Sequence, residues 1–256
     1  MAPEITRRRF AVTAASLVAS VAIGDRRSAF SQTAASRDGR FRARPKSGVS
    51  TTLASGPLGL EKSGRDGVIQ VPSGVPRDTP VPLLLFLHGA TQSGERMLAR
   101  VGAAADQAGV AVLAPDSRGT TWDAIRGDFS DDVAFLDRAL EHVFGHLAID
   151  PTRIAIGGFS DGASYALSLG LANGDLFPRV VACSPGFIIQ APAHGHPLFF
   201  FSHGTNDQVL PIDQCSRVIV PRLQQMGYAV TFREFNGRHE LPPEMAAEAL
   251  RWVSLR

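Results

Sequence analysis

Continuous apolar runs recur along the chain, and most are followed by a stretch with helical spacing of its apolar residues. Runs without polar alternation are typical of strands that are buried on both faces of a sheet. We predict such strands at 81–89, 110–115, 153–159, 180–184, 197–204 and 229–235. Helices are predicted at 95–108, 130–147, 161–173, 212–226 and 243–253, and short antiparallel strands at 49–60 and 67–71. Alternating strands and helices predict an α/β fold with a mostly parallel central sheet and helices on both faces.

The hexapeptide Gly-Gly-Phe-Ser-Asp-Gly (157–162) lies where a predicted strand ends and a predicted helix begins. Glycines stand two places before and two places after Ser160, which gives the pattern G-x-S-x-G. A turn that presents a serine hydroxyl there brings the helix so close to the strand that side chains at both places would collide. Gly158 and Gly162 remove that collision. The context predicts Ser160 as a nucleophile, and a tight turn with an incidental serine is the alternative.

A serine hydroxyl needs a base to take its proton, and the base needs an acid that orients it. After a G-x-S-x-G turn, the acid and then the histidine are expected in that order, each behind a later strand. Asp207 lies in the loop after the fifth long predicted strand, and His239 lies in the loop after the last one. We therefore predict Asp207 and His239 as the partners of Ser160. Two rival acids are present, Asp213 and Glu240.

An ester hydrolysed by a serine passes through an oxyanion, which needs backbone N–H donors. The N–H of Asp161, at the start of a predicted helix, is one expected donor. The second is expected from His88-Gly89-Ala90, after the strand at 81–89, with the N–H of Ala90 as the donor. Gly89 would let this backbone approach a substrate, and we expect both His88 and Gly89 to line the substrate site.

The first 48 residues differ in composition from the rest. They hold ten basic and three acidic side chains, whereas the remainder holds 16 basic and 21 acidic ones. Thr6-Arg7-Arg8-Arg9-Phe10 precedes a short apolar run and is similar to a twin-arginine export signal. We predict an export signal over 1–30, a disordered basic linker over 31–48 and a catalytic domain over 49–256. This implies a periplasmic or extracellular protein, the alternative being a cytoplasmic one with a disordered basic start.

The composition argues against several other classes. The mildly acidic body gives no indication of a nucleic-acid surface, and the apolar run near the N-terminus is shorter than a membrane span. Two cysteines, Cys183 and Cys215, are too few for a disulfide framework. No Cys/His spacing typical of a metal site includes them, and we expect neither a metal nor an organic cofactor.

Taken together, four segments resemble the phospholipase/carboxylesterase family of serine esterases, which have the α/β-hydrolase fold. The segments read LHGATQSG, GGFSDGASYALSLGL, SHGTNDQVLP and GRHELP. The resemblance implies that Ser160, Asp207 and His239 form the triad, and it places Trp122 near the substrate. It implies the roles of Ala90 and Asp161 as well. Family members commonly have Gln where this chain has Asp161, whose carboxylate would oppose an oxyanion unless it points away.

About a dozen residues separate the strand at 180–184 from the next, too few for a cap domain, so we expect an open active site. Phe187 and Ile188 in this loop would line an acyl pocket or, equally, anchor the loop. The sequence predicts a serine hydrolase for carboxylic esters or thioesters that acts through an acyl-enzyme. Alternatives on the same fold are a peptidase, an acyltransferase, a polyester depolymerase or feruloyl-esterase-like enzyme and, last, a non-catalytic binding protein. Natural substrate, acyl length, signal cleavage site and oligomeric state stay open.

Overall fold

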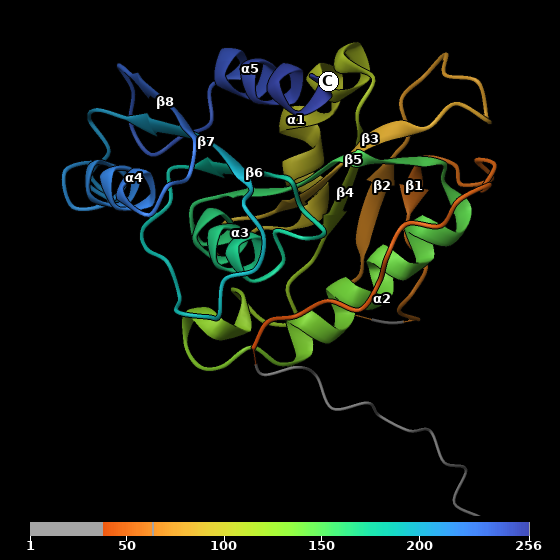
Figure 1. Ribbon diagram of the computed structural model, residues 1–256, viewed down its shortest axis with the longest axis horizontal. Coiled ribbons are helices and arrows are strands. Elements are labelled where there is room, and N and C mark those ends of the chain that lie inside the picture. Colours follow the sequence, from red (N-terminus) through yellow and green to blue (C-terminus); the bar gives the residue numbers. More distant parts are fainter. Residues whose placement is uncertain (1–37, 63, 256) are drawn as a thin grey trace, which may run out of the picture. The chain divides into compact units, whose positions relative to one another are not determined.

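The computed structural model describes residues 38–62 and 64–255, and an eight-stranded sheet runs through this part of the chain (Figure 1). The strands are β1 Gly56–Pro57, β2 Gly67–Gln70, β3 Val81–Leu87, β4 Ala111–Pro115, β5 Ile149–Phe159, β6 Arg179–Cys183, β7 Leu198–Gly204 and β8 Val230–Phe235. The α-helices are α1 Gly94–Ala108, α2 Asp131–His146, α3 Asp161–Ala172, α4 Ser216–Gln225 and α5 Pro243–Ser254, with a 3₁₀ turn, η1, at Asp123–Ile125.

The strand order is β1-β2-β4-β3-β5-β6-β7-β8. All neighbours from β4 to β8 run parallel, whereas β1 and β2 are antiparallel to their neighbours. The predicted mostly parallel sheet is thus confirmed. The strand expected over 49–60 shrinks to the two residues of β1, because Pro57 has no N–H to donate and Gly59 turns the chain at a φ of 69°.

Residues along each central strand alternate between two apolar layers. Leu83, Leu85 and Leu87 of β3 pack into one layer, and Leu84 and Phe86 pack into the other. Helices α2, α3 and α4 supply the first layer, and α1 and α5 supply the second, so helices cover both faces of the sheet (Figure 1). Side chains of both layers are buried along the same strand, which explains why these strands read as continuous apolar runs.

Residues 184–197, between β6 and β7, contain no helix or strand. This agrees with the predicted lack of a cap domain at this position. Among the described residues, no helix has both the length and the apolar character that a membrane crossing requires.

Residues 38–48 pack against the domain, contrary to the predicted disordered linker. They run beside α2 (Figure 1), where the N–H groups of Arg42 and Ala43 both donate to Asp137 Oδ1 at 2.8 Å. Phe41 is 2% exposed and meets the ring of Phe177 edge-on at 5.9 Å. We call residues 38–48 the N-terminal strap.

Two polar residues after α3 hold the strap in place. Asn173 accepts the N–H of Phe41 through Oδ1 and donates to the carbonyl of Gly39, both at 2.8 Å. Asp175 receives the guanidinium groups of Arg40 and Arg44 at 2.6 and 2.7 Å. The linker prediction is therefore wrong for 38–48, because basic residues that read as solvated instead pair with one carboxylate. Residues 31–37 and the predicted export signal lie outside the described residues.

Replacing Phe41 by alanine is expected to lower the free energy of unfolding by about 3 kcal/mol, since a buried ring leaves a cavity behind. Urea unfolding of the full chain would measure the change. Arg42→Ala is the matched control: its side chain is exposed, and we expect a change below about 0.5 kcal/mol. Equal unfolding midpoints for the two variants would show that the strap adds nothing to stability.

Candidate active site

Ser160 stands at the sharp turn between β5 and α3 with φ 58° and ψ −124°. Its N–H donates to the carbonyl of Cys183 in the neighbouring strand at 3.0 Å. A non-glycine residue with positive φ is strained, so the surrounding structure must hold it there. The predicted strand–turn–helix context of the serine is present as expected.

The two flanking glycines leave no room for a side chain. A Cβ on Gly158 would lie 2.4 Å from the carbonyl of Gly162, and a Cβ on Gly162 would lie 2.3 Å from the Leu87 oxygen. Both contacts are with backbone, which cannot rotate away. The glycines thus permit α3 to start directly against β5 and β3, as the sequence predicts.

The structure brings Ser160, His239 and Asp207 into one hydrogen-bonded chain, although 79 residues separate the serine from the histidine. His239 Nδ1 lies 2.7 Å from Asp207 Oδ2, and His239 Nε2 lies 2.8 Å from Ser160 Oγ. An ionised carboxylate only accepts hydrogen bonds, so Nδ1 carries the proton. The neutral ring then accepts the Ser160 hydroxyl at Nε2, which is the arrangement that general-base activation requires.

Asp207 is held as a charged acceptor. Its Oδ1 accepts the N–H groups of Val209 and Leu210 at 2.9 and 2.8 Å, and its side chain is fully buried. Burial acts to raise its pKa, but the Leu210 N–H and the His239 ring outweigh that effect and hold the pKa below the ordinary value. Of the two rival acids, Asp213 pairs with Arg217 and Glu240 accepts the N–H of Arg238.

The two residues expected to donate to the oxyanion belong to segments that adjoin Ser160. Asp161 is the first residue of α3, where an N–H has no acceptor within the helix. The Ala90 N–H donates to no group among the hydrogen bonds of the described residues. Gly89 is so near that a Cβ there would lie 3.2 Å from the Ser160 Cβ. Neither N–H has a hydrogen-bond partner among the described residues, which leaves both available to an oxyanion.

The carboxylate of Asp161 has a partner of its own. Thr121 donates its hydroxyl to Asp161 Oδ2 at 2.6 Å. The next two residues are tied down as well, since the Trp122 indole donates to the His88 carbonyl and Asp123 accepts the Tyr165 hydroxyl. The negative charge next to the expected oxyanion site is thereby bound to an ordered segment.

His88 and Trp122 do not line the substrate site, contrary to expectation. Both side chains are 0% exposed, and their rings pack together with centroids 4.8 Å apart. His88 Nε2 accepts the N–H of Ser117 at 2.9 Å and contacts Arg65 at 3.1 Å, so its proton is on Nδ1, which donates to the Gly89 carbonyl. Burial lowers the pKa of His88, and the neutral ring supports the loop from behind. The sequence alone does not show that the histidine and the tryptophan at these two positions are buried.

Sequence reasoning missed Arg65 and Thr121. Arg65 donates to the carbonyls of Gln92, in the loop after β3, and of Ser117, in the loop after β4, at 2.7 and 2.6 Å, and thus links these two loops. Arg65 lies in a turn rich in glycine and charged residues, and nothing in the sequence there distinguishes it from an ordinary surface arginine. Thr121 directly precedes Trp122, in a segment that the sequence analysis names. That neighbourhood is the only feature of the sequence that could have pointed to Thr121.

Phe187 and Ile188, whose roles were left open, divide between the two possibilities. Ile188 is partly buried and packs against the apolar core, so it anchors the loop. Phe187 is 42% exposed. Its loop adjoins the loop of the triad aspartate, because a Cβ on Gly186 would lie 3.2 Å from the Leu210 side chain. Phe187 is therefore the more exposed of the two side chains, in a loop that adjoins the loop of Asp207.

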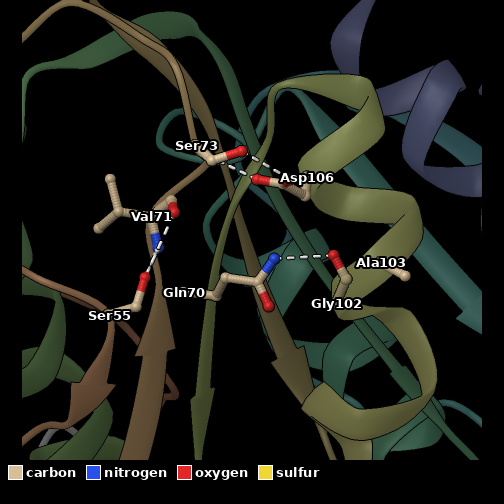
Figure 2. Close-up of a pocket in the computed structure, with 7 residues that line it drawn as sticks. All are labelled: Ser55, Gln70, Val71, Ser73, Gly102, Ala103 and Asp106. Atoms are coloured by element: carbon tan, nitrogen blue, oxygen red, sulfur yellow. Dashed lines mark hydrogen bonds between the residues drawn. The ribbon is translucent and has the colours of Figure 1, made fainter.

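Other features of the described residues offer no second site. No group of three His, Cys, Asp or Glu side chains is placed to hold a metal, and Cys183 and Cys215 are buried free thiols. A hollow of about 430 Å³ lies between β2 and α1. Figure 2 shows the residues that line it. Its polar side chains are satisfied locally: Ser73 binds Asp106, and Gln70 donates to the Gly102 carbonyl.

Comparison with known proteins gives matches in sequence and in fold. The family described as Phospholipase/Carboxylesterase matches residues 124–255. Feruloyl esterase C of Emericella nidulans is 30% identical over 177 residues, which cover 66% of this chain and 64% of that protein. The chain thus spans less than two thirds of the length of this curated relative.

Solved structures show the same fold at low sequence identity. FphF, a fluorophosphonate-binding serine hydrolase of Staphylococcus aureus, superposes with a TM-score of 0.62 at 16% identity, covering 74% of this chain and 92% of that one. A ferulic acid esterase of Anaeromyces mucronatus superposes with a TM-score of 0.59 at 18% identity, covering 83% of this chain and 93% of that one. Together with the sheet order, these likenesses identify the fold as that of the α/β-hydrolases.

Proposed function

Since the chain belongs to the phospholipase/carboxylesterase family, we propose that it is a serine hydrolase that cleaves carboxylic esters through an acyl-enzyme. The observation that carries the proposal is the hydrogen-bonded chain Ser160–His239–Asp207, with contacts of 2.8 and 2.7 Å. A protein that only binds ligands has no need of this arrangement beside two free backbone N–H groups.

In the proposed reaction, Ser160 Oγ attacks the ester carbonyl while its proton passes to His239 Nε2. Asp207 fixes the ring and stabilises the imidazolium that forms. The N–H groups of Ala90 and Asp161 bind the oxyanion of the tetrahedral intermediate. His239 then gives the proton to the leaving alcohol, which departs and leaves an ester on Ser160. Water, activated by His239, attacks this ester and releases the acid, and the serine regains its proton.

We propose esters of hydroxycinnamic acids as the narrower substrate class. The support is the 30% identity to a relative named feruloyl esterase C, together with the exposed ring of Phe187 in the loop after β6. An aromatic acyl group placed against that ring would gain stacking contacts. The lack of a cap between β6 and β7 agrees with substrates whose alcohol part is large.

Export remains a proposal that rests on the sequence alone. The Thr6–Phe10 pattern and the basic residues before the strap support it, and they lie outside the described residues.

Fluorophosphonate labelling of the full chain tests the reaction class. We expect one covalent adduct, located on Ser160 by peptide mass spectrometry, and none after heat denaturation. Methyl ferulate and p-nitrophenyl esters from acetate to palmitate then test the substrate. We expect faster hydrolysis of methyl ferulate and short esters than of palmitate. A native protein without label and without turnover would refute the hydrolase proposal, whereas turnover of acetate but not of ferulate would refute only the narrower substrate class.

A further inference from the structure

A second histidine, His203, lies beside the aspartate of the triad. It belongs to β7, and its side chain is 0% exposed. Its Nε2 lies 2.8 Å from the Leu210 carbonyl oxygen and 3.2 Å from Asp207 Oδ2, and its Nδ1 lies 2.7 Å from Ser216 Oγ. The proposed reaction uses His239 alone, so this buried and fully partnered imidazole needs another explanation.

The partners of His203 fix the position of its proton. A carbonyl oxygen only accepts hydrogen bonds, so the Nε2 next to Leu210 carries the hydrogen. Burial lowers the pKa of His203 and keeps the ring neutral, which leaves Nδ1 as an acceptor for the Ser216 hydroxyl. Ser216 thus selects the one tautomer whose N–H faces Leu210 and Asp207.

Leu210 connects this ring to the carboxylate. Its carbonyl accepts from His203, while its N–H donates to Asp207 Oδ1 at 2.8 Å. The N–H of His203 also lies near Oδ2, the same oxygen that accepts His239 Nδ1–H. Each carboxylate oxygen therefore has one contact that involves the ring of His203, directly at Oδ2 and through Leu210 at Oδ1.

We propose that His203, with its tautomer set by Ser216, is a positioning residue that orients the Asp207 carboxylate toward His239. The inference rests on the proposed function, since orientation of Asp207 matters for rate only if His239 acts as a base. Misplacement of a catalytic group by about 1 Å lowers rates by about 10²-fold, and that sets the size of the expected effect.

Two variants of the full chain test the role. His203→Leu removes the donor, and we expect kcat for p-nitrophenyl butyrate to fall by about 10- to 100-fold with KM within about twofold. His203→Gln retains an N–H near the position of Nε2, and we expect kcat within about fivefold of the wild type. His194→Leu, on an exposed loop histidine, is the matched control and should leave kcat unchanged.

A spectroscopic readout separates orientation from mere stability. The proton between His239 Nδ1 and Asp207 is expected to give a low-field resonance in the proton NMR spectrum. It should persist in wild type and His203→Gln and disappear in His203→Leu. Should His203→Leu fail to fold, Ser216→Ala gives the test instead, with an expected loss of about three- to tenfold in kcat.

Several results would overturn the inference. One is a folded His203→Leu variant with unchanged kcat, and another is an equal loss of kcat in the Leu and Gln variants. Unchanged kcat in Ser216→Ala, where the Leu variant does not fold, would overturn it as well. Each of these presumes a wild type that labels at Ser160 and hydrolyses the ester. A wild type that does neither would instead refute the proposed function itself.

Discussion

Ser160→Ala is expected to lower kcat/KM for ester hydrolysis by about 10⁴-fold or more, the range seen when a nucleophile of this kind is removed. Among residues 38–62 and 64–255, the hydroxyl is the only hydrogen-bond partner of His239 Nε2, so we expect no other side chain to take over the attack. Binding of the ester should change little, because the oxyanion donors are backbone groups. Initial rates with p-nitrophenyl butyrate measure the loss.

The control for this variant is Ser47→Ala, at an exposed serine of the strap. Its activity should equal that of the wild type. Thermal unfolding of Ser160→Ala should also stay within a few degrees of the wild type, since in the described part of the chain the hydroxyl bonds only to His239. If Ser160→Ala kept more than a tenth of the activity, the nucleophile would have to be another residue.

Gly162→Ala is expected to lower the free energy of unfolding by about 4 kcal/mol and to slow fluorophosphonate labelling severely. The added Cβ would lie 2.3 Å from the Leu87 carbonyl oxygen and 2.5 Å from that of His88, so α3 and β3 must move apart. Such a movement displaces Ser160 from His239. Urea unfolding gives the stability change, and the labelling rate gives the change in the site.

Gly145→Ala, on helix α2, is the matched control: it makes the same substitution at a glycine without a close backbone contact. Nothing lies closer than 4.0 Å to a Cβ at this position of α2, and alanine is favoured over glycine within helices by about 1 kcal/mol. We therefore expect this variant to be slightly more stable than the wild type and equally active. A destabilisation of the same size in both variants would show that the close contact at Gly162 does not determine the effect, since helix propensity alone favours alanine at both positions.

The sheet and the triad geometry could be predicted because both depend on order along the chain. Each buried strand reads as an apolar run, and a residue that directly follows such a run reaches the carboxyl edge of the sheet. Ser160, Asp207 and His239 all satisfy this rule, and the structure brings them within hydrogen-bonding distance. The glycines beside the serine were equally readable, because only a close backbone contact explains them.

The supporting residues could not be predicted in the same way. His88 was expected at the substrate from its place after a strand, and Trp122 from the family resemblance, but burial is a property of the packed structure. Arg65 contacts His88 and Gln92, in the loop after β3, from a turn about 25 residues earlier. No local sequence pattern predicts this pairing. The prediction for the strap was wrong for a similar reason. Its arginines resemble solvated side chains in the sequence, which does not show that Asp175 faces them.

The strap also has a consequence for the order of events during synthesis. Its residues leave the ribosome well before their partners, since Phe41 and Arg40 bind residues more than 130 positions later in the chain. Contacts between such distant residues form late, after the intervening strands have paired. The contacts of the strap with Asn173 and Asp175 therefore cannot form until about two thirds of the polypeptide has been translated, so the strap is completed only after most of the sheet has been made.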